Sequence, residues 1–122
     1  MKRLLLDTNI YGEMVIDKNI DKLKIGIRES KSLVIFGLNL IRKELRAVPN
    51  NLQLGSHNLR IDLLSLYDEV VKSRVHSVTT EAENIASYCY KLYRELGGSK
   101  GKSEMFNDLV IVAVCSLKGM DV

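Results

Sequence analysis

Three acidic residues stand where the sequence pattern leaves a carboxylate little contact with water. Asp7 directly follows three consecutive leucines, and Glu44 lies four residues after Leu40, on the apolar side of its predicted helix. Asp108 precedes the apolar run 109–115, which predicts a buried helix. A carboxylate in such surroundings is normally protonated, paired or bound to a metal ion.

Clustered carboxylates suit Mg²⁺ and Mn²⁺, hard cations that take oxygen ligands and keep several waters. Like charges repel, so such a cluster needs a cation to stay fully ionised, and its acids titrate as a coupled set. A bound ion can activate water and neutralise charge on a reacting phosphodiester. A cluster of these three acids would therefore suit phosphodiester hydrolysis.

Each acid also has a purely structural explanation. Asp7 can cap a following helix through a side-chain oxygen. Asp108 can complement the dipole of a helix that starts there. Glu44 can pair with Lys43, Arg46 or another base. Together, however, the three acids form a pattern of strand end, inward helix face and helix start.

The elements that must position these acids alternate between strands and helices. A continuous apolar run such as residues 3–6 is typical of a central parallel strand, and ligands of α/β sheets bind beyond the carboxyl ends of such strands. The alternation predicts an α/β fold with a mostly parallel sheet. Strands are expected over 3–6, 33–36 and 74–78 and from Met120, helices over 21–28, 40–47, 59–72, 80–96 and 108–118, and a short turn over 11–15.

Local signals predict where some of these elements begin. Asn39 is expected to cap helix 40–47, and Asn107 the last helix. Thr80 and Glu83 have the spacing of a capping box. Residues 50–58 are polar and are expected to form a loop.

The residues around the three acids resemble the motifs of the PIN-domain family, Mg²⁺/Mn²⁺-dependent ribonucleases with a three-layer, Rossmann-like α/β/α fold. Residues 4–10 (LLLDTNI) resemble the first motif, residues 40–45 (LIRKEL) the second and residues 107–113 (NDLVIVA) the third. Order and spacing agree over the whole chain, and the first and third motifs are the more specific.

The resemblance implies a role for five residues. Asp7, Glu44 and Asp108 would be catalytic and would bind Mg²⁺ or Mn²⁺. Thr8 and Asn9 match polar residues that follow the first acid, and they would support the site through hydrogen bonds or a held water.

One departure from the family pattern concerns the last segment. The family usually has a further acid or polar residue shortly after a strand that follows the last helix. Here that strand would begin at Met120, and Asp121 lies before the expected position. We expect a single PIN-like domain over residues 1–122 whose C-terminal strand is cut short, which leaves the activity of this polypeptide open.

Composition sets the remaining bounds. The chain has 122 residues, of which 46% are hydrophobic, enough for one domain with a real core, and its net charge of +3 allows nucleic acid as a partner without requiring it. No apolar run is long enough to span a bilayer and no leader precedes a cleavage site, so we expect a cytoplasmic protein with no membrane partner. Cys89 and Cys115 fall in apolar helical patterns and are expected to be buried thiols.

The segment 98–103 superficially resembles a phosphate-binding loop. That motif needs glycine where this chain has Leu96, and the loop follows a helix rather than a strand, so we reject a nucleotide site. Lys100 and Lys102 can instead contact RNA phosphates as a loose basic rim, the alternative being a solvated flexible loop. The histidines and cysteines lack the spacing of zinc ligands.

The leading hypothesis is a metal-dependent endoribonuclease, the toxin of a toxin–antitoxin pair or an RNA-processing enzyme. RNA, an antitoxin protein and a second copy of the chain are the partners that the resemblance implies. The rival is a non-catalytic RNA-binding or interaction module with an incomplete metal site. A ligand-binding Rossmann-like domain is disfavoured because no glycine-rich turn follows the first strand.

Overall fold

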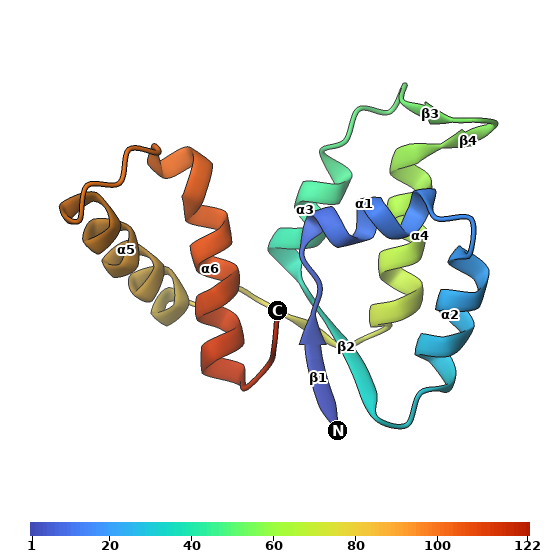
Figure 1. The fold of residues 1–122 in the computed structure, drawn as a ribbon, viewed down its shortest axis with the longest axis horizontal. Coiled ribbons are helices and arrows are strands. Elements are labelled where there is room, and N and C mark those ends of the chain that lie inside the picture. Colours follow the sequence, from blue (N-terminus) through green and yellow to red (C-terminus); the bar gives the residue numbers. More distant parts are fainter.

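The computed structural model describes residues 1–122, apart from the side chain of Leu54. It is an α/β structure with a small open parallel sheet, strand order β1-β2-β5, six helices and a separate two-stranded hairpin (Figure 1). The strands are β1 (Lys2–Leu5), β2 (Leu33–Leu38), β3 (Gln53–Leu54), β4 (His57–Asn58) and β5 (Val75–His76), and the helices are α1 (Thr8–Ile16), α2 (Ile20–Glu29), α3 (Asn39–Arg46), α4 (Leu59–Val71), α5 (Thr80–Glu95) and α6 (Lys102–Lys118).

The small parallel sheet confirms the coarser prediction, an α/β fold with a mostly parallel sheet. β1 pairs with β2 over its whole length, beginning with Lys2 opposite Leu33, and the end of β2 pairs with β5. On the other edge of β1, Asp121 forms an isolated parallel bridge with Leu4, and its carbonyl accepts a hydrogen bond from the Leu5 amide at 2.8 Å. The predicted strand from Met120 is therefore present as a single bridge.

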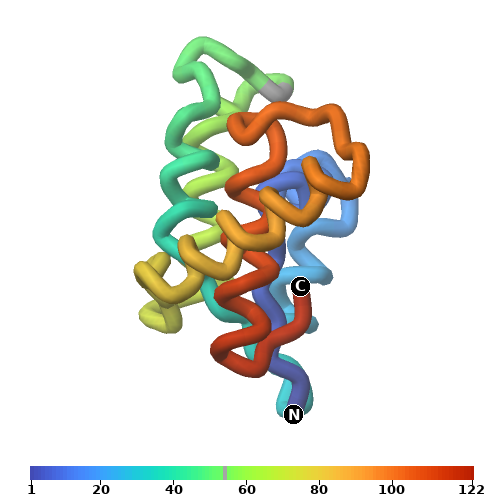
Figure 2. Tube along the Cα trace, turned by 90° about the vertical axis from the view of Figure 1, so that its left-hand side faces the viewer, coloured from blue at the N-terminus to red at the C-terminus, as the bar shows by residue number. Residues whose placement is uncertain are grey.

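Helices lie on both sides of the sheet. In Figure 1, α5 and α6 lie on one side, and α1, α2 and α4 on the other. Figure 2 shows α5 crossing obliquely in front of α6. The core between these elements holds no buried polar or charged side chain among the described residues. Its most deeply buried aliphatic side chains are Leu5, Ile35, Leu38, Ile41, Leu45, Leu66, Val71, Val110 and Val114.

Helix α4 lies very close to the sheet at Gly37 of β2. A Cβ atom there would lie 2.7 Å from both Cζ of Tyr67 and Cγ1 of Val71 on α4. The Tyr67 hydroxyl donates to the Leu38 carbonyl at 3.3 Å. Glycine therefore lets α4 pack directly on the strand that leads into α3.

The predicted start of the last helix is wrong. α6 begins at Lys102 after an extended Gly101, so Asn107 lies inside the helix and does not cap it. Phe106 packs against the core, which favours an earlier start than the polar residues suggest. Nor is α6 buried on every side, because Val112 is 56% exposed.

The predicted capping box is displaced by one residue. Thr79, not Thr80, is the N-cap of α5, and its hydroxyl accepts from the Ala82 amide at 3.1 Å. The residue three positions after the cap is therefore Ala82 rather than Glu83, and no box forms. Two adjacent threonines made the sequence signal ambiguous.

Other local predictions also differ from the structure. Asn39 is the first residue of α3 rather than its cap, and its Oδ1 accepts from the Val78 amide at 3.3 Å, which ties the end of β5 to α3. The first helix is longer than the turn predicted over 11–15, and the β3–β4 hairpin lies within the predicted loop 50–58.

The prediction that both cysteines are buried thiols is confirmed for Cys115 only. Both cysteines are free thiols, and Cys115 is buried whereas Cys89 is only partly so. In the described part of the chain, no helix has the length and apolar character needed to cross a membrane.

Candidate metal centre

Asp7 lies just beyond the carboxyl end of β1 and caps α1. Its Oδ1 accepts hydrogen bonds from the Asn9 amide at 3.0 Å and the Ile10 amide at 3.2 Å. The structural explanation for Asp7 is thus confirmed. Capping uses one oxygen, and Oδ2 makes no hydrogen bond to another described residue, so capping and metal binding are compatible.

Glu44 lies on α3 and is partly buried. The proposed pairing with Lys43 or Arg46 is absent: among the described residues, Glu44 takes part in no ion pair. The neighbouring Arg42 instead binds Asp68 through two hydrogen bonds of 3.0 Å. Glu44 is therefore an inward carboxylate without a basic partner.

The charges of the other two acids affect the pKa of Glu44. Burial raises the pKa of the Glu44 carboxyl, the Thr8 hydroxyl lowers that pKa, and the negative charges of Asp108 and Asp7 raise it further. The net shift is upward. The two aspartates come from distant parts of the chain, so the fold has gathered the predicted acids at one edge of the sheet.

Asp108 is exposed on α6 and lies more than one turn after the start of that helix. The effect of a helix dipole falls off within the first turn, so the dipole explains little of this acid's position. Asp108 lines a cavity of about 170 Å³ together with Asp7, Asn9 and Ile111. Two of the three acids and a predicted supporting residue thus share one small pocket.

Thr8 contributes a buried hydroxyl to this region. Its Oγ1 has no hydrogen bond of good geometry to any described residue. Its effect on the pKa of Glu44 nevertheless places it beside that carboxyl. The Glu44 carboxyl is thus within reach of the Thr8 hydroxyl as a hydrogen-bond acceptor.

The acids do not form a closed ligand set in this structure. Among the described residues, no three histidine, cysteine, aspartate or glutamate side chains are close enough together to hold a metal ion. Joint coordination by Asp7, Glu44 and Asp108 therefore stays a prediction.

The predicted basic rim lies in the loop between α5 and α6 and at the start of α6. The Lys100 amide donates to the Tyr93 hydroxyl at 2.9 Å, and the Lys100 carbonyl accepts from the Tyr90 hydroxyl at 3.1 Å. The Lys102 ammonium lies 4.8 Å from the centre of the Phe106 ring. The loop is thus anchored by two tyrosines, which the flexible-loop alternative did not foresee.

A second cavity, of about 280 Å³, lies between α3, α5 and α6 and was missed in the sequence. Its lining includes Lys43, Glu83, Phe106 and Asn107. These residues come from three helices and follow no common spacing. The available signal was that Lys43 and Asn107 each directly precede one of the predicted acids.

Comparison of the chain with protein-family models, curated proteins and solved structures finds no significant match. The fold itself defines an α/β protein with a small parallel sheet, in which Asp7 and Asp108 lie near enough to Glu44 to raise the pKa of its carboxyl.

Proposed function

We propose that this chain is a PIN-like, Mg²⁺- or Mn²⁺-dependent endoribonuclease with a Rossmann-like α/β/α fold. The observation that carries the proposal is the gathering of Asp7, Glu44 and Asp108 at one sheet edge, from three segments far apart in the sequence. Each acid lies in a segment that resembles a motif of that family, in the family's order.

The donor atoms of these residues suit a hard divalent cation in kind, although in the part of the chain that the structure describes the three acids do not form a closed ligand set. Carboxylate oxygens are the ligands that Mg²⁺ and Mn²⁺ prefer. Asp7 would supply its Oδ2, and Glu44 and Asp108 would supply their carboxylates. The Thr8 hydroxyl beside Glu44 suits a water held near such an ion. When bound, the ion would supply an activated water and neutralise phosphodiester charge.

The chain's own residues would hold and orient this arrangement. The α1 amides fix the Asp7 carboxylate through Oδ1, which leaves Oδ2 for the site. Glu44 retains its proton to a higher pH than an ordinary glutamate, so it must release that proton before it can act as a ligand. Cation affinity should therefore rise with pH.

The resemblance also suggests a biological setting. A toxin of a toxin–antitoxin pair, or an enzyme of RNA processing, would have RNA as substrate and act in the cytoplasm. An antitoxin protein and a second copy of the chain would be its protein partners.

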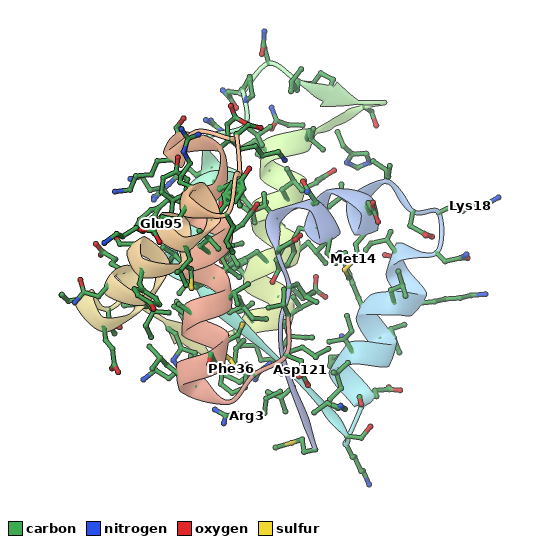
Figure 3. The ribbon with its side chains drawn as sticks, turned by 60° about the vertical axis from the view of Figure 1, so that its left-hand side comes forward. Arg3, Met14, Lys18, Phe36, Glu95 and Asp121 are labelled. Carbon is green, nitrogen blue, oxygen red and sulfur yellow. The ribbon has the colours of Figure 1, made fainter. Side chains whose placement is uncertain are left out.

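The test is Mn²⁺ binding by calorimetry, followed by cleavage of labelled single-stranded RNA in Mn²⁺. Asp7→Asn is the informative variant because asparagine keeps the cap but loses the charge. Glu95→Gln on α5 is the matched control, since Glu95 is exposed and makes no ion pair among the described residues (Figure 3).

We expect wild type and Glu95→Gln to bind Mn²⁺ saturably and cleave RNA, and Asp7→Asn to do neither. No binding by wild type would overturn the metal proposal, and an unchanged cleavage rate in Asp7→Asn would overturn the role of Asp7. RNA retained without cleavage would favour the alternative, a non-catalytic RNA-binding module.

A further inference from the structure

The cavity between α3, α5 and α6 adjoins the acidic edge without belonging to it. Lys43 lines the cavity and Glu44 follows it on α3; Asn107 lines the cavity and Asp108 follows it on α6. Consecutive helical residues point about 100° apart, so the same two helices present acids to one side and cavity residues to another.

We infer that this cavity binds one nucleobase of the RNA, in the nucleotide next to the phosphodiester held at the acids. The inference rests on the proposed function, because it takes RNA as the substrate. The cavity would recognise a base, whereas the acids alone would recognise only the phosphate backbone.

The lining has the chemistry of a base-binding site. Four lining side chains are apolar and four are polar or charged, which suits a flat, partly polar ring better than a lipid or an apolar peptide. Phe106 supplies an aromatic ring, and stacking of bases on aromatic side chains is the common way in which proteins hold single-stranded RNA. The amides of Asn39 and Asn107 supply hydrogen-bonding groups.

Two cations are placed to hold the backbone that carries this base. Lys43 lines the cavity, and the Lys102 ammonium lies over the Phe106 ring. Lys102 is not a lining residue, so we expect it to contact a phosphate of the bound strand rather than the base.

Glu83 determines which bases fit best. A carboxylate repels phosphate but accepts hydrogen bonds from an exocyclic amino group, as on cytosine or adenine, whereas uracil presents a carbonyl oxygen there. The cavity should therefore prefer cytosine or adenine to uracil. Replacing Glu83 with glutamine, which can both donate and accept, should reduce that preference.

The test measures binding rather than cleavage. Fluorescence anisotropy in chelator follows labelled RNA hexanucleotides on wild type, Phe106→Leu and Tyr88→Leu. Phe106→Leu keeps an apolar side chain and removes the stacking plane. Tyr88→Leu is the matched control, because Tyr88 is an exposed aromatic on α5 that does not line the cavity. Hexanucleotides with one abasic position are compared with the intact sequence, and Mn²⁺ calorimetry runs in parallel.

We expect Phe106→Leu to weaken binding about tenfold and Tyr88→Leu to leave it unchanged. One abasic position should weaken binding to wild type but not to Phe106→Leu, and Glu83→Gln should narrow the preference for cytosine or adenine over uracil. Equal RNA affinity of Phe106→Leu and wild type, with Mn²⁺ binding intact, would overturn the base site while leaving the metal proposal standing. If wild type does not bind Mn²⁺ but Phe106→Leu still weakens RNA binding, the metal proposal is overturned and the base site stands.

Discussion

Glu44 is a carboxylate held in surroundings that disfavour its charge. Its pKa is raised by burial and by Asp108 and Asp7, so the folded state binds this proton more tightly than the unfolded chain does. The free energy of unfolding therefore falls as pH rises from the ordinary glutamate pKa through the raised value. Without metal, we expect Glu44→Gln at pH 7 to raise the melting temperature, measured by thermal denaturation in chelator.

The same variant separates stability from function. Mn²⁺ should raise the melting temperature of wild type and of the control Glu95→Gln, because a ligand that binds only the folded state stabilises it. Glu44→Gln should show no such increase. A lower melting temperature of Glu44→Gln in chelator would mean that the carboxylate is a structural group.

Asp7 offers a second distinction between structure and chemistry. Asp7→Asn keeps an oxygen for the Asn9 and Ile10 amides, whereas Asp7→Ala removes it. Urea denaturation should show Asp7→Ala less stable than Asp7→Asn by about 1 kcal/mol, the usual cost of a lost N-cap. Both variants should lose Mn²⁺ binding. Equal stability of the two would mean that the cap contributes nothing measurable.

At the scale of elements, the packing of α4 on β2 leaves no room for a side chain at Gly37. A methyl group at Gly37 would collide with Tyr67 and Val71, and overpacking of this kind typically costs about 1–3 kcal/mol. We expect Gly37→Ala to lower the free energy of unfolding by this amount in urea. The control is Gly26→Ala in α2, where an added Cβ meets nothing within 4 Å and which should not destabilise the chain.

The corrected cap of α5 gives another comparison. Thr79→Ala should cost about 1 kcal/mol, because it removes the acceptor for the Ala82 amide. Thr80→Ala should cost less, since Thr80 is the first helical residue and its hydroxyl makes no cap bond. If Thr80→Ala instead lowered the free energy of unfolding in urea more than Thr79→Ala, Thr80 would be the N-cap, as the sequence suggested.

These elements show what the sequence could predict. The strand that ends before Asp7 and the inward side of α3 follow from apolar runs and helical spacing, which depend on neighbours in the chain. The start of α6 could not be predicted in that way, because it depends on Phe106 packing against the core. The cavity beside the acids depends on three helices meeting, so the one local signal, that Lys43 and Asn107 each directly precede a predicted acid, was not enough to predict it.

At the scale of the whole molecule, the contact between the sheet and the C-terminal end of α6 makes the stability of the fold depend on acidic pH. The His76 ring stacks on Phe36 at 5.3 Å, and the Arg3 guanidinium lies 5.0 Å over the same Phe36 ring and donates to the Lys118 carbonyl at 3.1 Å. Burial lowers the pKa of His76, and the charges of Lys118 and Arg3 lower it further. His76 Nε2 is also buried without a hydrogen-bond partner among the described residues. The folded molecule therefore favours the neutral ring.

The sign of this effect is opposite to that of Glu44. The unfolded chain takes up the His76 proton at a higher pH than the folded one, so stability falls as pH falls below the ordinary histidine pKa toward the lowered value. We expect His76→Gln to flatten that decline in urea denaturation between pH 7.5 and pH 5.5. The control His57→Gln, at an exposed histidine, should leave the decline in stability unchanged.

The two tyrosine hydroxyls that bind Lys100 have a consequence for hydrogen exchange. The Lys100 amide lies in an exposed loop, yet it donates to Tyr93, and its carbonyl accepts from Tyr90. Deuterium should therefore replace this amide hydrogen more slowly than those of Ser99 and Gly101 on either side. Tyr93→Phe would remove the difference, so a single amide would report whether the loop before α6 keeps its shape.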